Sequence, residues 1–460
     1  MINTNTFEGR IEMTKDLTVG NPQKVLWKFT IPMFISVMFQ QFYSMADSLI
    51  AGKYAGEEAL AAVGASFPIT FIFLAVAVGF NVGCSVVISR LFGAKKYANM
   101  KSAISTAVLA SLIIAGIMSV IGIIFTPDLM RLINTPDNIF ADGSIYLKIY
   151  VAGFTFLFLY NISTGIFTSL GDSMTPLYFL IGSSMGNVYL DIVFVKNLHM
   201  GVAGVAWATF IAQGIACVLA LAVVFRRLRT IEVKEKYKKF SRDMLSKIGQ
   251  IAVPSILQQS FISVGNIFVQ SIINGYGSSV IAGYSAAVKL NGFGIACFLT
   301  MGTGMSNYTS QNIGAKKFDR VHEGLKSGIL MAIILSAPFF LILFFNAEGM
   351  LKLFMNEESS VAMNTGIIFL RTITPFYFVV SLKVMVDGVL RGAGAMKYFM
   401  IATFIDLILR VILAYVFSAA KGANGIWAAW NYGWTIATVA TFIFYFDVRK
   451  KMKEHKILEI

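Results

Sequence analysis

The chain has 460 residues, of which 57% are hydrophobic and only 13% carry a charge. Water-soluble domains contain about 25% charged residues, so this composition excludes an ordinary soluble protein. The runs 59–89, 102–127 and 149–171 contain no charged residue, and each exceeds the ~20 apolar residues with which a helix crosses a bilayer. Strands of a transmembrane barrel would instead alternate in polarity over about 10 residues. We therefore predict an all-α integral membrane protein.

Twelve transmembrane helices are predicted along the chain from the long apolar runs. They lie at approximately 28–50, 60–88, 102–126, 146–168, 175–196, 201–225, 248–274, 280–306, 324–346, 366–388, 397–418 and 424–446. Cys84, Cys217 and Cys297 all fall inside these spans, which predicts small packing residues rather than a disulfide framework.

The first span carries an unexpected acid in the sequence QQFYSMADS, residues 40–48. A charge at the centre of a bilayer costs about 2.5–3.5 kcal/mol on insertion scales, so such residues usually face a cavity and have a function. Gln40 lies seven residues before Asp47, which places both on one helix face. The pattern favours a functional carboxylate at Asp47; the alternative is a structural polar contact between packed helices.

The distribution of basic residues predicts the orientation in the membrane. The connection at 226–247 contains nine Lys or Arg and three acids, and the tail DVRKKMKEHK is also basic. Loops on the other side, such as TPDNIFADGS, contain more acids than basic residues. By the positive-inside rule, both termini and the 226–247 connection are cytoplasmic, in the inner membrane of a cell. The net charge of +14 is spread over separate loops, which argues against a nucleic-acid partner.

The two halves of the chain resemble each other. IPMFISVMFQQ near residue 31 corresponds to VPSILQQSFIS near 253, LFGAKKYANMKS to NIGAKKFDRVHEG, and GVAGVAWAT to GANGIWAAW. Six spans per half place both halves in the same orientation, which is a parallel internal repeat of the kind found in transporters. We predict an N-lobe at 1–225, a basic cytoplasmic linker at 226–247 and a C-lobe at 248–460. Two such six-helix bundles suit alternating access.

No catalytic machinery is evident in the sequence. It contains no G-x-x-x-x-G-K-[ST] phosphate loop, which argues against ATP hydrolysis by this chain. His199, His322 and His455 are far apart, with no metal-ligand spacing, and no Ser-His-Asp or Cys-His set is found in the spans. We predict a transporter that is not an enzyme, needs no cofactor and is driven by an ion gradient.

Several motifs together resemble one family. They are IPMFISVMFQQFYSMADSLIAGKYAGEEALAAVG, LFGAKK, SLGDSMTP and GVAGVAWAT, with LRGAG in the second half. The chain resembles, over essentially its whole length, the multidrug and toxic compound extrusion (MATE) family, and its DinF-like branch more than its NorM-like branch. The resemblance implies two six-helix bundles in a V-shaped arrangement. It also implies export of small organic, cationic substrates in exchange for protons or sodium.

The resemblance also implies a set of ion-coupling residues in the N-lobe. The DinF-like branch has a first-span Asp, a Gln seven residues before it, an Asn and an Asp in span five, a Thr in span six and a Tyr in span four. The matching residues here are Gln40, Asp47, Asn187, Asp191 and Thr209, with Tyr146 or, as the second choice, Tyr150. Two nearby carboxylates in an apolar cavity should not both stay ionised without a cation. A proton or Na⁺ at Asp47 and Asp191 is therefore expected, and no other metal site.

The second half carries its charges in a different pattern. Lys383 and Asp387 are four residues apart, as are Asp406 and Arg410, so each pair can neutralise itself on one helix face. Span seven contains no acid between 248 and 274, whereas the NorM-like branch has acidic cation ligands in spans seven and ten. These pairs are interpreted as mainly structural, and Lys289 is left without a role.

Two other transporter classes are alternatives. A lipid-linked oligosaccharide flippase of the same superfamily is the main alternative, although such flippases often have fourteen spans. A major-facilitator carrier would show G-x-x-x-D-R/K-x-G-R/K-R/K after span two, where this chain reads SRLFGAKKYANMK. The predicted protein is a monomeric multidrug exporter, surrounded by membrane lipids.

Overall fold

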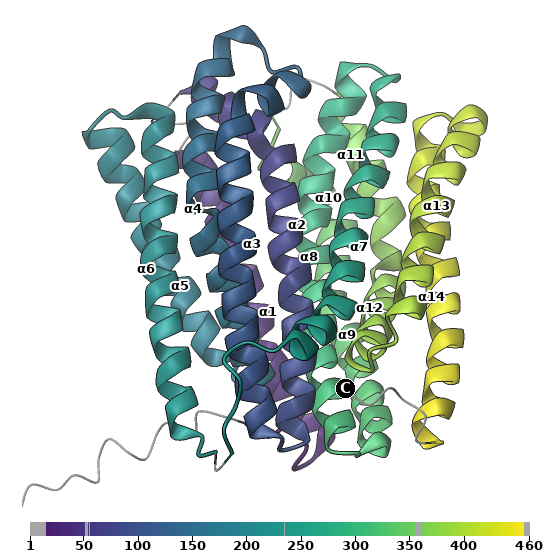
Figure 1. The fold of residues 1–460 in the computed structure, drawn as a ribbon. Helices are drawn as coiled ribbons and strands as arrows, with labels where there is room; N and C mark the ends of the chain where they lie inside the picture. The colour runs from purple at the N-terminus through teal and green to yellow at the C-terminus, as the bar shows by residue number, and fades with distance from the viewer. Residues whose placement is uncertain (1–14, 51–53, 55, 234, 356–359, 455–460) are drawn as a thin grey trace, which may run out of the picture. The chain divides into compact units, whose positions relative to one another are not determined.

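The computed structural model describes residues 15–50, 54, 56–233, 235–355 and 360–454. This part of the chain is helical and contains no strand, which confirms the predicted all-α class (Figure 1). The helices are α1 Pro22–Ile50, α2 Glu57–Gly93, α3 Tyr97–Leu132, α4 Asp137–Ser169, α5 Met174–Asp191, α6 Gly201–Thr230, α7 Arg242–Asn274, α8 Ser278–Gly314, α9 Phe318–Phe345, α10 Ala347–Leu351, α11 Ser360–Ile373, α12 Tyr377–Gly392, α13 Met396–Lys421 and α14 Ala423–Lys453. A π-helical segment, Ile192–Asn197, continues α5.

Each of the twelve predicted spans lies on helical structure, although the span predicted at 366–388 falls on two helices, α11 and α12. Ten segments of the described chain are long and apolar enough to cross a membrane. One of them, Ser360–Gly392, comprises α11, the short 3₁₀ turn Thr374–Phe376 and α12; Pro375 lies in this turn, where its missing N–H interrupts the helical ladder. The predicted first and twelfth spans fall on α1 and α14. α14 is rich in Trp, Tyr and Thr, which lowers its mean hydropathy.

The chain forms two compact units. Unit 1 comprises Met1–Val19 and Met38–Val253, and unit 2 comprises Gly20–Val37 and Pro254–Ile460. Two helices are therefore divided: the first half of α1 packs in unit 2, and the first half of α7 packs in unit 1. Both helices contain a proline, Pro32 in α1 and Pro254 in α7, and proline weakens the backbone ladder at such points. The compact units thus exchange these half-helices relative to the lobes expected at 1–225 and 248–460.

Unit 1 is built around close contact of α2 with α4. Ser85 donates a hydrogen bond to the Gly165 carbonyl (3.2 Å), and Ser169 donates one to the Ser85 carbonyl (3.0 Å). Earlier along both helices, the rings of Phe73 and Phe154 pack edge to face, with their centroids 5.0 Å apart. Small side chains allow membrane helices to approach closely, and this approach takes the place of the hydrophobic effect in lipid.

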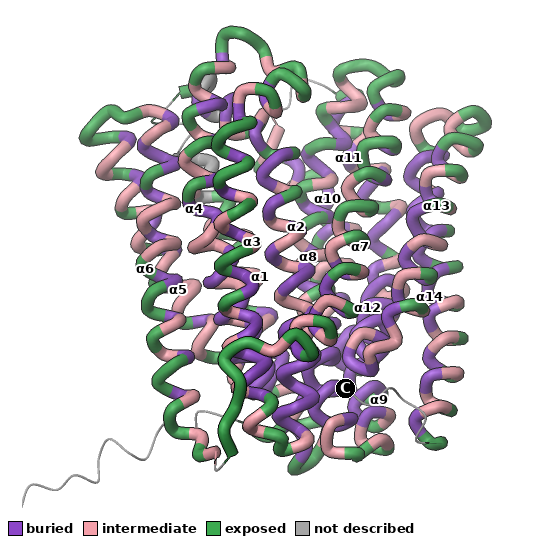
Figure 2. Tube along the Cα trace, viewed as in Figure 1, coloured by how far each residue is buried: buried purple, intermediate pink, exposed green. Residues whose placement is uncertain are grey.

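Unit 2 repeats this arrangement with α8 and α12. A Cβ on Gly388 would lie 2.4 Å from the Gly302 carbonyl oxygen, so only glycine fits there. Ser310 donates a hydrogen bond to the Gly392 carbonyl (3.1 Å). The last turns of α8, 304–313, are buried throughout, as are the last turns of α2, 83–93 (Figure 2). The two halves of the sequence repeat therefore pack their second helices in the same way.

The sequence SLGDSMTP forms the turn between α4 and α5. Gly171 has a φ of +77°, and a Cβ there would lie 1.9 Å from the Lys15 carbonyl oxygen. Asp172 accepts hydrogen bonds from the first backbone N–H groups of α5, including that of Thr175 at 3.0 Å. Arg227 of α6 donates to both the Asp172 carboxylate and the Thr175 hydroxyl. The motif thus fixes the position of α5, whose other end carries Asp191.

Candidate functional site

The polar site of unit 1 is formed where α1 meets α5. Asp191 is the last residue of α5 and is only 1% exposed. Its carboxyl group lies within electrostatic range of that of Asp47, which is partly buried on the second half of α1. Among the described residues, no donor forms a hydrogen bond to either carboxyl oxygen of Asp191 or to Oδ1 of Asp47. The pair therefore consists of two acids with no basic partner, which is unfavourable unless a proton or a cation is present.

A second polar contact joins the same two helices one turn away. Tyr43 lies four residues before Asp47, and Asn187 lies four residues before Asp191. The Tyr43 hydroxyl donates a hydrogen bond to Oδ1 of Asn187. Asn187 is 3% exposed, and its Nδ2 has no acceptor among the described residues. The i, i+4 spacing on both helices aligns the two contacts on one interface.

Tyr43 was not among the residues predicted for this site. Its signal in the sequence is the hydroxyl one helical turn before Asp47, in YSMAD. Aromatic residues are frequent in this chain, with 17 Tyr and 40 Phe, so the spacing alone does not separate a polar contact from lipid-facing packing. The tertiary contact with Asn187 makes that distinction.

Helix α4 supplies two stacked tyrosines to the same region. The rings of Tyr146 and Tyr150 lie 6.2 Å apart at 21°, and Tyr146 is within electrostatic range of both carboxyl groups. Both tyrosines line a small pocket together with Thr209 and Gln213 of α6. Thr209 donates its hydroxyl hydrogen bond to the Val205 carbonyl (3.1 Å). The predicted residues Tyr146, Tyr150 and Thr209 thus share one pocket.

Gln40 is set apart from the other predicted residues. It lies on α1 two turns before Asp47, with an exposed side chain. No hydrogen bond joins Gln40 to the cluster among the residues that the structure describes. A sodium ion at the acid pair would therefore be served by the oxygens of Asp47, Asp191 and Asn187, with the nearby tyrosine hydroxyls.

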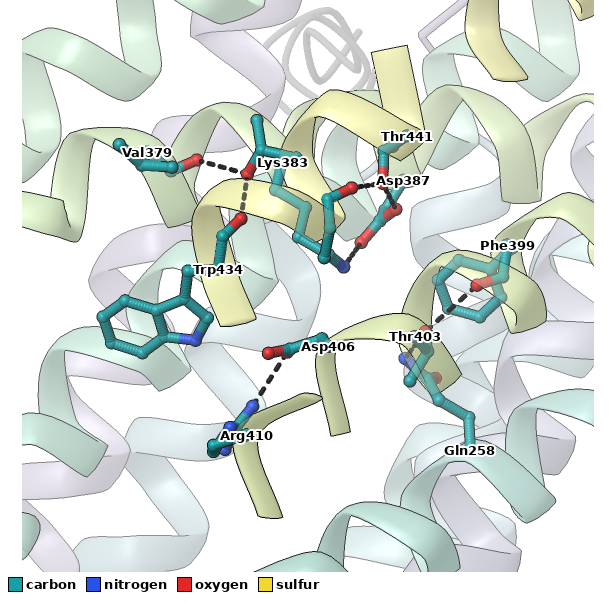
Figure 3. Close-up of polar contacts among 12 residues, drawn as sticks. Gln258, Val379, Lys383, Asp387, Phe399, Thr403, Asp406, Arg410, Trp434 and Thr441 are labelled. Carbon is teal, nitrogen blue, oxygen red and sulfur yellow. Dashed lines mark hydrogen bonds and ion pairs between the residues drawn. The ribbon is translucent and has the colours of Figure 1, made fainter. Parts of the chain in front are cut away.

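The buried charges of unit 2 are arranged as closed ion pairs, as predicted (Figure 3). Lys383 Nζ lies 2.6 Å from Asp387 Oδ2, and Arg410 Nη2 lies 2.8 Å from Asp406 Oδ2. Each pair lies on one helix, α12 or α13, and all four residues are buried. Every acid here has a basic partner, in contrast to the pair in unit 1. No contact in the described chain explains Lys289, which is exposed on α8.

Comparison with known proteins gives consistent matches over the chain. The MatE family model matches residues 32–193 and 254–416, so its two matched segments start at equivalent points of the sequence repeat. A probable multidrug resistance protein of Bacillus subtilis (strain 168), YoeA, is 25% identical over 94% of this chain and 95% of its own. A second from the same organism, YpnP, is 28% identical over 94% and 96%.

Solved structures show the same fold. A MOP superfamily transporter from Pyrococcus furiosus Vc1 (DSM3638) superposes with a TM-score of 0.90 at 24% identity, covering 96% of this chain and 99% of that one. The match extends through both units of the chain. Together with the ten apolar helices, these similarities identify a multi-pass membrane transporter rather than an enzyme.

Proposed function

This chain belongs to the MatE family, and we propose that it exports small organic molecules in exchange for H⁺ or Na⁺. The family match and the names of its relatives support a role in multidrug efflux. The observation that carries the ion coupling is the pair Asp47 and Asp191, two interacting carboxyl groups without a basic partner in the described chain. The proposed substrates are cationic, and the proposed unit of transport is one chain in the cytoplasmic membrane.

The acid pair supplies the chemistry that coupling requires. Two neighbouring carboxylates in a site shielded from water repel each other, and both lack the hydration that ionised groups have in water. A proton shared by the pair, or a sodium ion bound between its oxygens, removes this repulsion. The bound cation is then released where the site opens to the other side of the membrane, and this release resets the transporter.

The occupancy of the pair also controls the contact between α1 and α5. When the cation is bound, the acids and the Tyr43–Asn187 hydrogen bond both hold these helices together. When it leaves, like charges face each other across the same interface, so the helices tend to separate. An ion gradient can in this way drive a change of conformation and thus alternating access, because the cation binds the two states with different affinity.

The test is dye efflux measured in inverted vesicles, with a proton gradient and a sodium gradient imposed separately. A cationic dye should be transported under at least one of the two gradients. Transport under only the proton gradient identifies H⁺ as the coupling ion, and the reverse identifies Na⁺. If neither gradient drives any cationic dye, the proposal is wrong and a lipid-linked oligosaccharide should be tried as substrate.

A further inference from the structure

A second polar pocket lies in unit 2, where the start of α9 meets the end of α14. It belongs to a different unit from the acid pair and takes no part in the proposed coupling. The residues that line it are Phe318, Asp319, Val321 and His322 from α9, with Tyr445, Arg449, Met452 and Lys453 from α14.

The two helices present matched polar stripes to this pocket. On α14, Tyr445, Arg449 and Lys453 follow one another at intervals of four residues, and on α9 His322 and Lys326 do the same. Such spacing places the side chains of each stripe on one helix face. His322 Nδ1 and the Tyr445 hydroxyl are 2.8 Å apart, and this hydrogen bond joins the two stripes in the lining of the pocket.

The charge of the pocket is strongly positive. Within electrostatic range of the His322 ring lie Arg449, Lys326 and Lys453, against the single acid Asp319. In the described chain, neither Arg449 nor Lys453 has an ion-pair partner. Arg449 is partly buried, and Lys326 and Lys453 are exposed. Three cations beside one acid attract an anion.

The acid within α14, Asp447, has partners outside the pocket. Asp447 accepts hydrogen bonds from Tyr398 (2.6 Å) and Lys451 (2.7 Å). Asp447 and Lys451 are offset by two residues from Arg449 and Lys453, so they lie on another face of the helix. Asp447 therefore does not neutralise the basic stripe.

The pocket also has an apolar side. Val321 is 1% exposed and Met452 2% exposed, and Phe318 lines the same space. Arginine binds phosphate through paired N–H groups, and lysine adds a compact charge. Basic pockets between the ends of transmembrane helices are suited to anionic lipid headgroups, whose acyl chains continue along apolar helix surfaces.

We propose that this pocket binds a phosphate-ester anion, supplied by an anionic phospholipid whose phosphate contacts Arg449 and Lys453. Asp319 lines the same pocket and accepts a hydrogen bond from a hydroxyl of the headgroup. This favours a glycerol-bearing headgroup over a bare phosphate. The lipid would then hold the ends of α9 and α14 together.

The test uses the purified full chain in detergent and follows its thermal unfolding midpoint as short-chain phosphatidylglycerol is added. Phosphatidylcholine and inorganic phosphate are added in parallel. The variant Arg449→Gln/Lys453→Gln should bind phosphatidylglycerol about tenfold more weakly than wild type, equivalent to ~1.4 kcal/mol. The matched control is Lys397→Gln/Lys450→Gln, which removes two exposed charges of unit 2 that do not line the pocket; it should stay within twofold of wild type.

Each outcome decides the proposal. A preference for phosphatidylglycerol that only the pocket variant loses supports a lipid site. Equal losses in both double variants mean diffuse attraction to a basic surface and overturn it, as does a wild-type protein that responds equally to phosphatidylcholine. Protection by inorganic phosphate at the same concentration would overturn the lipid source and identify free phosphate instead. Because the readout is lipid binding, failure here is distinct from failure of dye efflux.

Discussion

The substitution Asp47→Asn tests the proposed coupling site most directly. It removes one charge of the acid pair while keeping the size and shape of the side chain. Because Asp191 has no hydrogen-bond donor to either carboxyl oxygen in the described chain, the variant leaves a single acid where two faced each other. The mutual repulsion that a bound cation relieves is therefore absent in the variant.

The size of the repulsion between the two carboxylates follows from Coulomb's law. Two unit charges about 4 Å apart at an effective dielectric constant of 20 repel each other by about 4 kcal/mol. A difference of that size changes an equilibrium constant by about a thousandfold. Without this repulsion, cation binding no longer shifts the equilibrium between the conformations, and Asn cannot take up and release a proton. We expect gradient-driven efflux to be abolished, while membrane expression and substrate binding without a gradient are retained.

The assay is dye efflux in inverted vesicles under the gradient that drives the wild type. Asp191→Asn should have the same effect, and the double variant should be no worse than either single one, because the two residues act as a unit. The control is Lys383→Met/Asp387→Leu, which removes a closed ion pair together and should leave considerable transport. Near wild-type pumping by Asp47→Asn would refute the reasoning and make this carboxylate a packing residue.

Three further predictions concern the contact between α1 and α5, the buried ion pair of α12 and the orientation of the chain in the membrane. Tyr43→Phe removes the hydrogen bond between α1 and α5, which is worth about 1 kcal/mol. Efflux in the vesicle assay should fall severalfold but keep its ion dependence. Loss of that dependence would place Tyr43 in the coupling chemistry itself. Lys383→Met alone leaves Asp387 buried without its partner and should lower the free energy of unfolding by about 3–5 kcal/mol. Denaturant unfolding in detergent measures this change. A larger loss in the double variant Lys383→Met/Asp387→Leu would contradict the prediction. Tags at 226–247 should be protected from an impermeant reagent in intact cells, while a tag at 128–142 should react, and labelling of 226–247 from outside would overturn the predicted topology.

Features that depend on neighbouring residues in the chain were predictable from the sequence. The uncharged runs gave the spans because a helix satisfies its own backbone hydrogen bonds, which lipid demands of every crossing segment. The ion pairs Lys383–Asp387 and Asp406–Arg410 were also predictable, because side chains four residues apart on one helix lie close together without any tertiary contact.

Features that join distant segments were decided by the tertiary structure. The sequence and the family resemblance suggested Asp47, Asn187 and Asp191 as members of one site, but the partner of Asn187 proved to be Tyr43, a residue 144 positions away along the chain. The pocket closed by His322 and Tyr445 had no signal at all, because its two stripes lie on α9 and α14, 123 residues apart. Local sequence specifies which face of a helix is polar; which other helix that face meets depends on how all the helices pack at once.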